Sequence, residues 1–135
     1  KVGPAYCTGV GKAMLAYLPE AELADVLAQQ SYHAFTGHTL TSAESLRSEL
    51  ADIRANGYGF DREEHEPGII CIALPILTEN GRALGALSVT STTTRTNLAG
   101  LESLVPRIQT TAQAIAKDAA SWHFPMTGVT QTRRN

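Results

Sequence analysis

The sequence predicts a mixed α and β fold in which helices flank an antiparallel β-hairpin. Helical patterns occupy residues 9–27 and 41–57, a short run rich in β-branched residues begins near residue 69, and a helical stripe returns after residue 98. The 135 residues are enough for one domain with a hydrophobic core and too few to suggest two.

The first two helices are predicted from their N-terminal residues. The first spans Gly9 to Tyr17 with Thr8 as its N-cap, because a threonine hydroxyl accepts a backbone N–H that the first turn leaves without a partner. The second opens at Pro19, whose fixed φ suits the first helical position, and Val26 lies on its buried stripe.

A third helix is predicted to begin at Thr41. The spacing Thr41-x-x-Glu44 has the form of a capping box, in which the cap and the third residue satisfy each other's backbone donors. Asn56-Gly57 ends this helix, since glycine accepts the left-handed conformation that commonly follows a last helical turn.

A final amphipathic helix is predicted from Leu98 to Ala119. Pro106 lies inside its pattern and either kinks the helix or makes it start later. Residues 126–135 are polar and are expected to form a disordered C-terminal tail.

Two strands, near residues 69–76 and 83–91, are predicted on either side of a tight turn. Asn80-Gly81 separates them, and this dipeptide favours a hairpin because both central positions of the turn need a positive φ. A two-residue turn places Glu79 opposite Arg82 and fixes the pairing of every residue further along the strands.

The predicted register gives the hairpin two different faces. The first face carries small side chains with hydroxyl and thiol groups: Cys71, Ala73, Ala86, Ser88 and Thr90. The second face is aliphatic: Ile70, Ile72, Leu74, Ile76, Leu87 and Val89. A face of small residues suits either a closely packed helix or a ligand, and the hydroxyls favour a ligand because buried hydroxyls need partners.

The start of the first helix is rich in glycine. In Thr8-Gly9-Val10-Gly11-Lys12 the first-turn N–H groups suit a carboxylate or a phosphate, although glycines that only allow close packing are equally common. The segment is not a phosphate-binding P-loop, since Tyr6 stands at the first glycine position and Ala13 follows the lysine.

Composition argues against several classes of protein. The formal charge is −2 and no cluster of Lys and Arg is present, so this segment alone is a poor DNA binder. No apolar run reaches the length of a membrane span, and Cys7 and Cys71 are expected to be reduced thiols in a cytosolic protein. The four histidines lack metal-ligand spacing, so neither a metal nor a cofactor is expected.

An enzymatic function is not favoured by the candidate nucleophile. The sequence places no base beside Cys71 or Asp61, and a cysteine within an aliphatic strand is usually an unreactive buried thiol. The acidic stretch of residues 63–66 is interpreted as a solvated strand end. A small enzyme of the hydrolase or isomerase type and a ligand-free dimerisation module stay open as alternatives.

Several segments taken together resemble the IclR (isocitrate lyase regulator) family of transcriptional regulators. Their order and spacing match from about Gly3 to Ala116. The segments are Cys7–Ala16, Phe35-Thr36 with Thr39–Thr41, Leu50–Tyr58, Asp61–Gly68 with Cys71–Ala73, and Ala86–Val89.

The resemblance implies a GAF-like effector-binding domain over residues 1–125, in which an antiparallel sheet packs against helices. It implies that the domain lacks its first helix and strands, and that a winged helix-turn-helix domain, absent here, binds DNA in the intact cytoplasmic homodimer or homotetramer. The implied ligand is a small carboxylate: a keto acid, an aromatic acid or a sugar acid. The implied ligand-binding positions are Gly9 and Val10, through their backbone N–H groups, with Asp61, Cys71, Ser88 and Thr90.

Overall fold

The computed structural model describes residues 5–121, so the predicted tail at residues 126–135 lies outside the described part of the chain. The elements in chain order are η1 (Ala5–Cys7), α1 (Gly9–Leu15), α2 (Glu20–Gln29), α3 (Ala43–Asn56), β1 (Gly59–Arg62), β2 (Ile69–Leu77), β3 (Ala83–Thr92), α4 (Leu98–Glu102) and α5 (Val105–Ala120).

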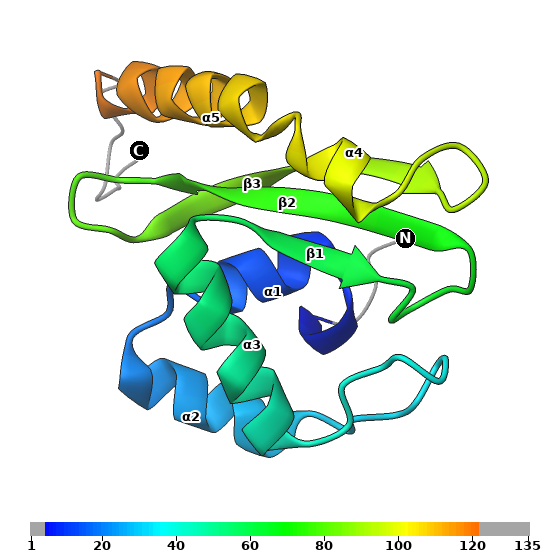
Figure 1. Cartoon of the computed structure of the whole chain (residues 1–135). Coiled ribbons are helices and arrows are strands. Elements are labelled where there is room, and N and C mark those ends of the chain that lie inside the picture. The colour runs from blue at the N-terminus through cyan, green and yellow to red at the C-terminus, as the bar shows by residue number, and fades with distance from the viewer. Residues whose placement is uncertain (1–4, 122–135) are drawn as a thin grey trace, which may run out of the picture.

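Residues 5–121 form an antiparallel sheet with helices on both faces, which confirms the predicted α+β class. The strand order is β1-β2-β3. Helices α4 and α5 cover one face, α1 lies against the other, and α2 and α3 lie beyond α1 (Figure 1). No helix within the described residues is both long enough and apolar enough to span a membrane.

The aliphatic face predicted for the hairpin forms the core beneath α4 and α5. Ile70, Ile72 and Leu74 are buried there against Leu101 of α4 and Ile108 of α5. The predicted final helix is divided into α4 and α5, and Pro106 lies in the first turn of α5, where its missing N–H costs no hydrogen bond. A separate apolar cluster joins η1 and helices α1, α2 and α3.

The predicted helix ends are confirmed in part. The Thr8 hydroxyl accepts a hydrogen bond from the Gly11 N–H at 3.1 Å, as an N-cap should, but α1 ends two residues before Tyr17. Pro19 is the residue before α2 rather than its first residue. Gly57 has φ +85° and ends α3 as predicted.

The capping residue predicted for α3 was wrong by one position. The Ser42 hydroxyl, not that of Thr41, accepts the first-turn N–H, from Ser45 at 3.1 Å. Serine and threonine are similar caps, so the residue that has extended φ and ψ at the helix entrance takes the role.

The hairpin has the predicted pairing but not the predicted turn. The Gly81 N–H donates to the Thr78 carbonyl at 2.9 Å and the Thr78 N–H donates to the Arg82 carbonyl at 2.8 Å, so Thr78 rather than Glu79 faces Arg82. The resulting three-residue loop places Gly81 at φ +80°.

One bulge restores the register. Leu77 pairs with Ala83 and Ile76 pairs with Gly85, which leaves Leu84 as an extra residue in β3. From Ile76 onward the pairs are those expected from the sequence, because the longer loop and the bulge each shift the register by one residue in opposite senses.

We predict that Ile72→Ala lowers the free energy of unfolding by about 2–5 kcal/mol, because Ile72 is 0% exposed between the sheet and α4/α5. Leu84→Ala is the matched control: it removes an aliphatic side chain from the same hairpin, but Leu84 is 54% exposed at the bulge, so a change within about 0.5 kcal/mol is expected. Urea unfolding followed by circular dichroism measures both. Equal losses would contradict the placement of the core.

Candidate functional site

Three of the predicted site residues form one row across the sheet. Asp61 of β1 pairs with Cys71 of β2, and Cys71 pairs with Thr90 of β3. Ser88 lies in the adjacent row, opposite Ala73. Directly paired residues of antiparallel strands project to the same side, so these four predicted residues share one face of the sheet.

Helix α1 is packed directly on part of this face. A Cβ atom added to Gly9 would lie 2.6 Å from the Cys71 Sγ atom and 3.4 Å from the Ala73 Cβ atom. Ala13 is buried against the same two side chains. Gly9 is therefore required for close backbone approach, and the interpretation of the small residues as a helix-packing surface is correct for Cys71 and Ala73.

The remaining part of the face is open to solvent within the described chain. Ser88 and Thr90 are exposed, and Val10 at the start of α1 is 39% exposed. The polar hydroxyls on β3 thus lie on the same face as the first turn of α1 without being covered by it. The N–H groups of Gly9 and Val10 have no acceptor inside the helix, as in any first turn.

The shortness of α1 limits what its dipole can contribute. The helix has seven residues, and the N-cap hydroxyl of Thr8 already satisfies the Gly11 N–H. Any anion attraction at this end comes from the individual N–H groups of Gly9 and Val10 more than from a long row of aligned peptides.

The pKa values of the acid and of the thiol in the row are both shifted upward. Burial raises the pKa of the Asp61 carboxyl above its ordinary value, although its Oδ1 accepts the Glu64 N–H at 2.8 Å. Burial also raises the pKa of the Cys71 thiol; the hydrogen bond to Thr90 opposes this effect and the charge of Asp61 adds to it. The structure does place an acid beside Cys71, but as a partner that disfavours the thiolate a nucleophile needs.

A buried lysine beside this site was missed in the sequence. Lys12 is 0% exposed, and its Nζ atom donates to the Glu49 Oε2 at 2.7 Å, the Glu64 Oε2 at 2.8 Å and the Phe60 carbonyl oxygen at 2.6 Å. All three ammonium protons are therefore used. Arg62 contacts the same Glu49 Oε2 at 2.9 Å from a half-exposed position.

The interpretation of residues 63–66 as a solvated strand end was wrong for Glu64. This residue is 2% exposed, its Oε2 also accepts the Arg62 N–H at 3.1 Å, and its Oε1 has no hydrogen-bond partner among the described residues. Lys12 and Glu64 are 52 positions apart. No local sequence pattern predicts an ion pair between residues so far apart. The one signal in the sequence was a charged residue, Lys12, between the small residues Gly11 and Ala13.

Glu49 and Glu64 contact the same ammonium, but their pKa values are shifted in opposite directions. Burial raises the pKa of Glu64 above its ordinary value even though Lys12 opposes this effect, and repulsion from Glu49 adds to it. For Glu49 the penalty of burial is outweighed by the charges and hydrogen bonds of Lys12 and Arg62, so its pKa falls. The difference has two causes: the Glu64 side chain is more deeply buried than that of Glu49, and the guanidinium of Arg62 contacts Glu49.

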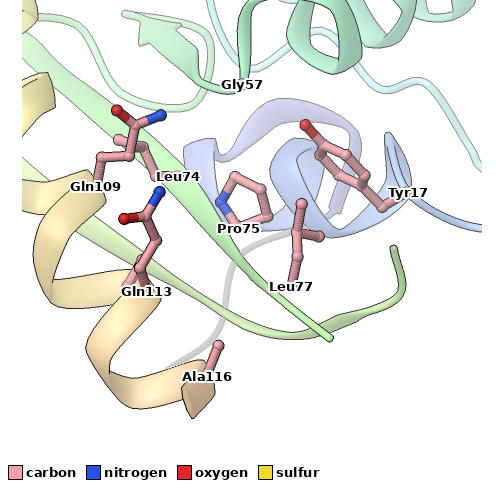
Figure 2. A pocket seen from close by; sticks show the side chains of 9 residues that line it. Tyr17, Gly57, Leu74, Pro75, Leu77, Gln109, Gln113 and Ala116 are labelled. Atoms are coloured by element: carbon pink, nitrogen blue, oxygen red, sulfur yellow. The ribbon is translucent and has the colours of Figure 1, made fainter. Parts of the chain in front are cut away.

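Two hollows lie at another part of the molecule. One of about 290 Å³ is bounded by Tyr17 on one side and by Gln109 and Gln113 of α5 on the other, around the end of β2 at Pro75 (Figure 2). A second of about 640 Å³ lies between the hairpin loop and the end of α5. Neither hollow includes a predicted site residue.

We predict that Gly9→Ala destabilises the fold by about 1–3 kcal/mol, since the added methyl group overlaps the Cys71 Sγ atom. Cys71→Ala should remove most of this cost, because the nearest remaining contact is the Ala73 Cβ atom at 3.4 Å. A double-mutant cycle of urea unfolding measures the coupling. Additive losses would show that Gly9 and Cys71 are not in contact. Gly37→Ala, where an added Cβ meets nothing within 4 Å, is the control.

We also predict that Asp61→Asn becomes more favourable relative to the unsubstituted protein as pH rises. The folded-state pKa of Asp61 is raised, so its contribution to stability is fully present below its ordinary pKa and is lost as pH rises through the folded value. Asparagine keeps an acceptor oxygen for the Glu64 N–H and carries no charge. Urea midpoints between about pH 4 and pH 8 measure the difference. The prediction is contradicted if the variant loses stability relative to the unsubstituted protein as pH rises.

The chain is similar in sequence to bacterial regulators and in structure to their C-terminal domains. Residues 1–117 match the family described as bacterial transcriptional regulator IclR C-terminal. The chain is 38% identical over 114 residues to the HTH-type transcriptional regulator XynR of Escherichia coli, covering 84% of this chain and 45% of XynR. It is 34% identical over 122 residues to KdgR of the same organism, covering 90% of this chain and 46% of KdgR.

Solved structures agree with the sequence comparisons. The C-terminal domain of E. coli KdgR superposes with a TM-score of 0.80 at 34% identity, over 87% of this chain and 71% of that one. An inducer-binding domain of PobR from Acinetobacter, a double mutant in complex with 3-hydroxybenzoic acid, gives a TM-score of 0.78 at 29% identity, over 84% of this chain and 66% of that one. The chain spans slightly less than half of the length of the curated relatives above. This protein belongs to the IclR family of bacterial transcriptional regulators and corresponds to its C-terminal domain.

Proposed function

We propose that this domain senses a small carboxylate and that the bound effector controls DNA binding by the intact regulator. The observation that carries the proposal is the gathering of Asp61, Cys71 and Thr90 in one row beside Ser88, with the start of α1 packed on Cys71. These groups come from four separate elements of the chain. Hydroxyls that remain exposed on a sheet face otherwise devoted to packing support a binding role.

The groups differ in what they offer a ligand. The N–H groups of Gly9 and Val10 and the hydroxyls of Ser88 and Thr90 can donate to a carboxylate. Asp61 can accept a hydrogen bond from a ligand hydroxyl, and Cys71, which Gly9 covers, lies between Asp61 and Thr90 in the middle of the row. The inducer-binding domain of PobR was solved with 3-hydroxybenzoic acid, which carries both a carboxylate and a hydroxyl, and this supports an aromatic acid as one candidate class.

The function of the whole protein is inferred from its relatives. We expect a winged helix-turn-helix domain to contact DNA, the regulator to be a homodimer or homotetramer, and the protein to act in the cytoplasm. The proposed control requires that the intact regulator has two arrangements that differ in DNA binding. An effector shifts the equilibrium between them only by its difference in affinity for the two, so it must bind one arrangement more tightly. The names of the relatives, which are transcriptional regulators, support a regulatory rather than an enzymatic role.

We predict that a carboxylate found by titration calorimetry binds less tightly to Ser88→Ala and to Thr90→Val. Each loss should be at least about tenfold, because a hydrogen bond to a charged carboxylate contributes about 1.5–3 kcal/mol. A panel containing a keto acid, 3-hydroxybenzoate and a sugar acid serves as the starting set. Ser91→Ala is the matched control, since Ser91 pairs with Ile70 and projects from the other face of the same strand.

Two results would count against the sensor function. The first is that no member of the panel binds, and the second is that Ser91→Ala lowers affinity as much as Ser88→Ala. Sedimentation of the same samples tests the dimerisation module: a stable dimer without any carboxylate binding would favour that alternative.

A further inference from the structure

We propose that Lys12 is the positioning residue of this face: its buried ammonium holds α1, and with it the Gly9 and Val10 turn, against the sheet. Its importance for ligand binding rests on the proposed function above. The hold on α1 is a separate property that can be measured without a ligand.

The bonds of Lys12 connect α1 to three other segments. Glu49 belongs to α3, Phe60 to β1, and Glu64 to the segment that follows β1. Lys12 lies three residues after Gly9, so the ammonium and the Gly9–Cys71 contact belong to the same turn of helix. The bond to Phe60 restrains that turn relative to the sheet directly, and the bonds to Glu49 and Glu64 restrain it relative to α3 and to the segment that follows β1.

A helix of this length needs such restraint. Seven residues are too few for a helix to persist in water without tertiary contacts. Gly9 and Ala13, which pack on Cys71 and Ala73 of β2, bury little apolar area of their own. The charge-assisted hydrogen bonds of Lys12 are stronger than the neutral hydrogen bonds found elsewhere around the face.

The partner Glu64 is itself held in place by its backbone. The Thr39 hydroxyl donates to the Glu64 carbonyl oxygen at 2.5 Å, and the Thr36 hydroxyl donates to the Glu63 carbonyl oxygen at 2.6 Å. Glu63 adopts φ +58°, a conformation uncommon for a residue with a side chain, and this bend directs the chain at Glu64. Lys12 is thus bonded to a fixed acceptor rather than to a mobile surface carboxylate.

Lys12 can be replaced without leaving an unpaired buried charge if the charge of Glu64 is removed as well. Lys12→Met alone leaves Glu64 as a buried carboxylate without a cation, which endangers folding. In the double variant Lys12→Met/Glu64→Gln that charge is gone, and Glu49 keeps Arg62 at 2.9 Å. No unpaired buried charge then remains in the cluster, but the three bonds from α1 are lost.

Cys71 reports on the position of α1. Its Sγ atom lies under Gly9, so a thiol reagent should reach it when α1 moves off the sheet. We expect iodoacetamide to label Cys71 at least about tenfold faster in the double variant of the full chain, as measured by peptide mass mapping that separates Cys71 from Cys7. The rate should not depend on low concentrations of urea, since a local opening exposes little surface.

The matched control is Arg47→Met/Glu20→Gln, the same pair of substitutions at an exposed salt bridge between α2 and α3. Its labelling rate should equal that of the unsubstituted chain. The proposal is overturned if Cys71 labelling in the Lys12 variant is unchanged, or rises only with the urea dependence of global unfolding. If the double variant does not fold, Glu64→Gln alone decides: it should accelerate labelling more than Glu20→Gln, and equal rates would overturn the proposal.

A titration with 3-hydroxybenzoate separates the two proposals. If the unsubstituted domain does not bind 3-hydroxybenzoate, this compound is not an effector. The labelling experiment still tests whether Lys12 holds α1. If the probe binds, its affinity should fall about tenfold in the Lys12 variant and stay constant in the Arg47 variant. Unchanged affinity in both would show that the position of α1 does not matter for the site.

Discussion

The ammonium of Lys12 has to be paired, because an isolated charge in the interior of a domain costs several kcal/mol. Its three acceptors come from α3, from β1 and from the segment after β1, so satisfying one side chain brings together parts of the chain up to 52 positions apart. The apolar cluster of α1, α2 and α3 packs on one side of this group, and the sheet packs on the other. The position of α1 relative to the sheet therefore depends on a polar interaction as well as on apolar burial.

The polar face of the sheet has two parts: residues of β2 on which α1 packs, and exposed hydroxyl residues of β3. Helix α1 approaches β2 through a layer of small residues: Gly9, Ala13, Cys71 and Ala73. The approach is so close that a Cβ atom on Gly9 would overlap the Cys71 Sγ atom. Ser88 and Thr90 lie on the same face but on β3, where they are exposed. Because the helix covers only part of the face, packing accounts for the small residues of β2, and the proposal of a ligand concerns the exposed hydroxyls of β3.

Asp61 has a place in both arrangements. Its Oδ1 atom accepts the Glu64 N–H, which helps to shape the segment that carries Glu64 to Lys12, while its strand partner is Cys71 of the proposed site. The row proposed to bind the ligand is thus one residue contact from the cluster that contains Lys12. In the proposed function, this contact couples occupancy of the face to the rest of the domain.

The sequence by itself determined the alternation of the hairpin, the end of α3 at Gly57 and the capped start of α1, because period, turn chemistry and capping act over a few residues. It also placed Cys71, Ser88 and Thr90 on one face through the hairpin register, and the family resemblance added Asp61. The burial of Glu64, the partners of Lys12 and the contact between Gly9 and Cys71 were decided only by tertiary structure. A charged side chain has the same local pattern on a solvated surface and in a buried ion cluster, and only the long-range packing of α1 on the sheet distinguishes the two.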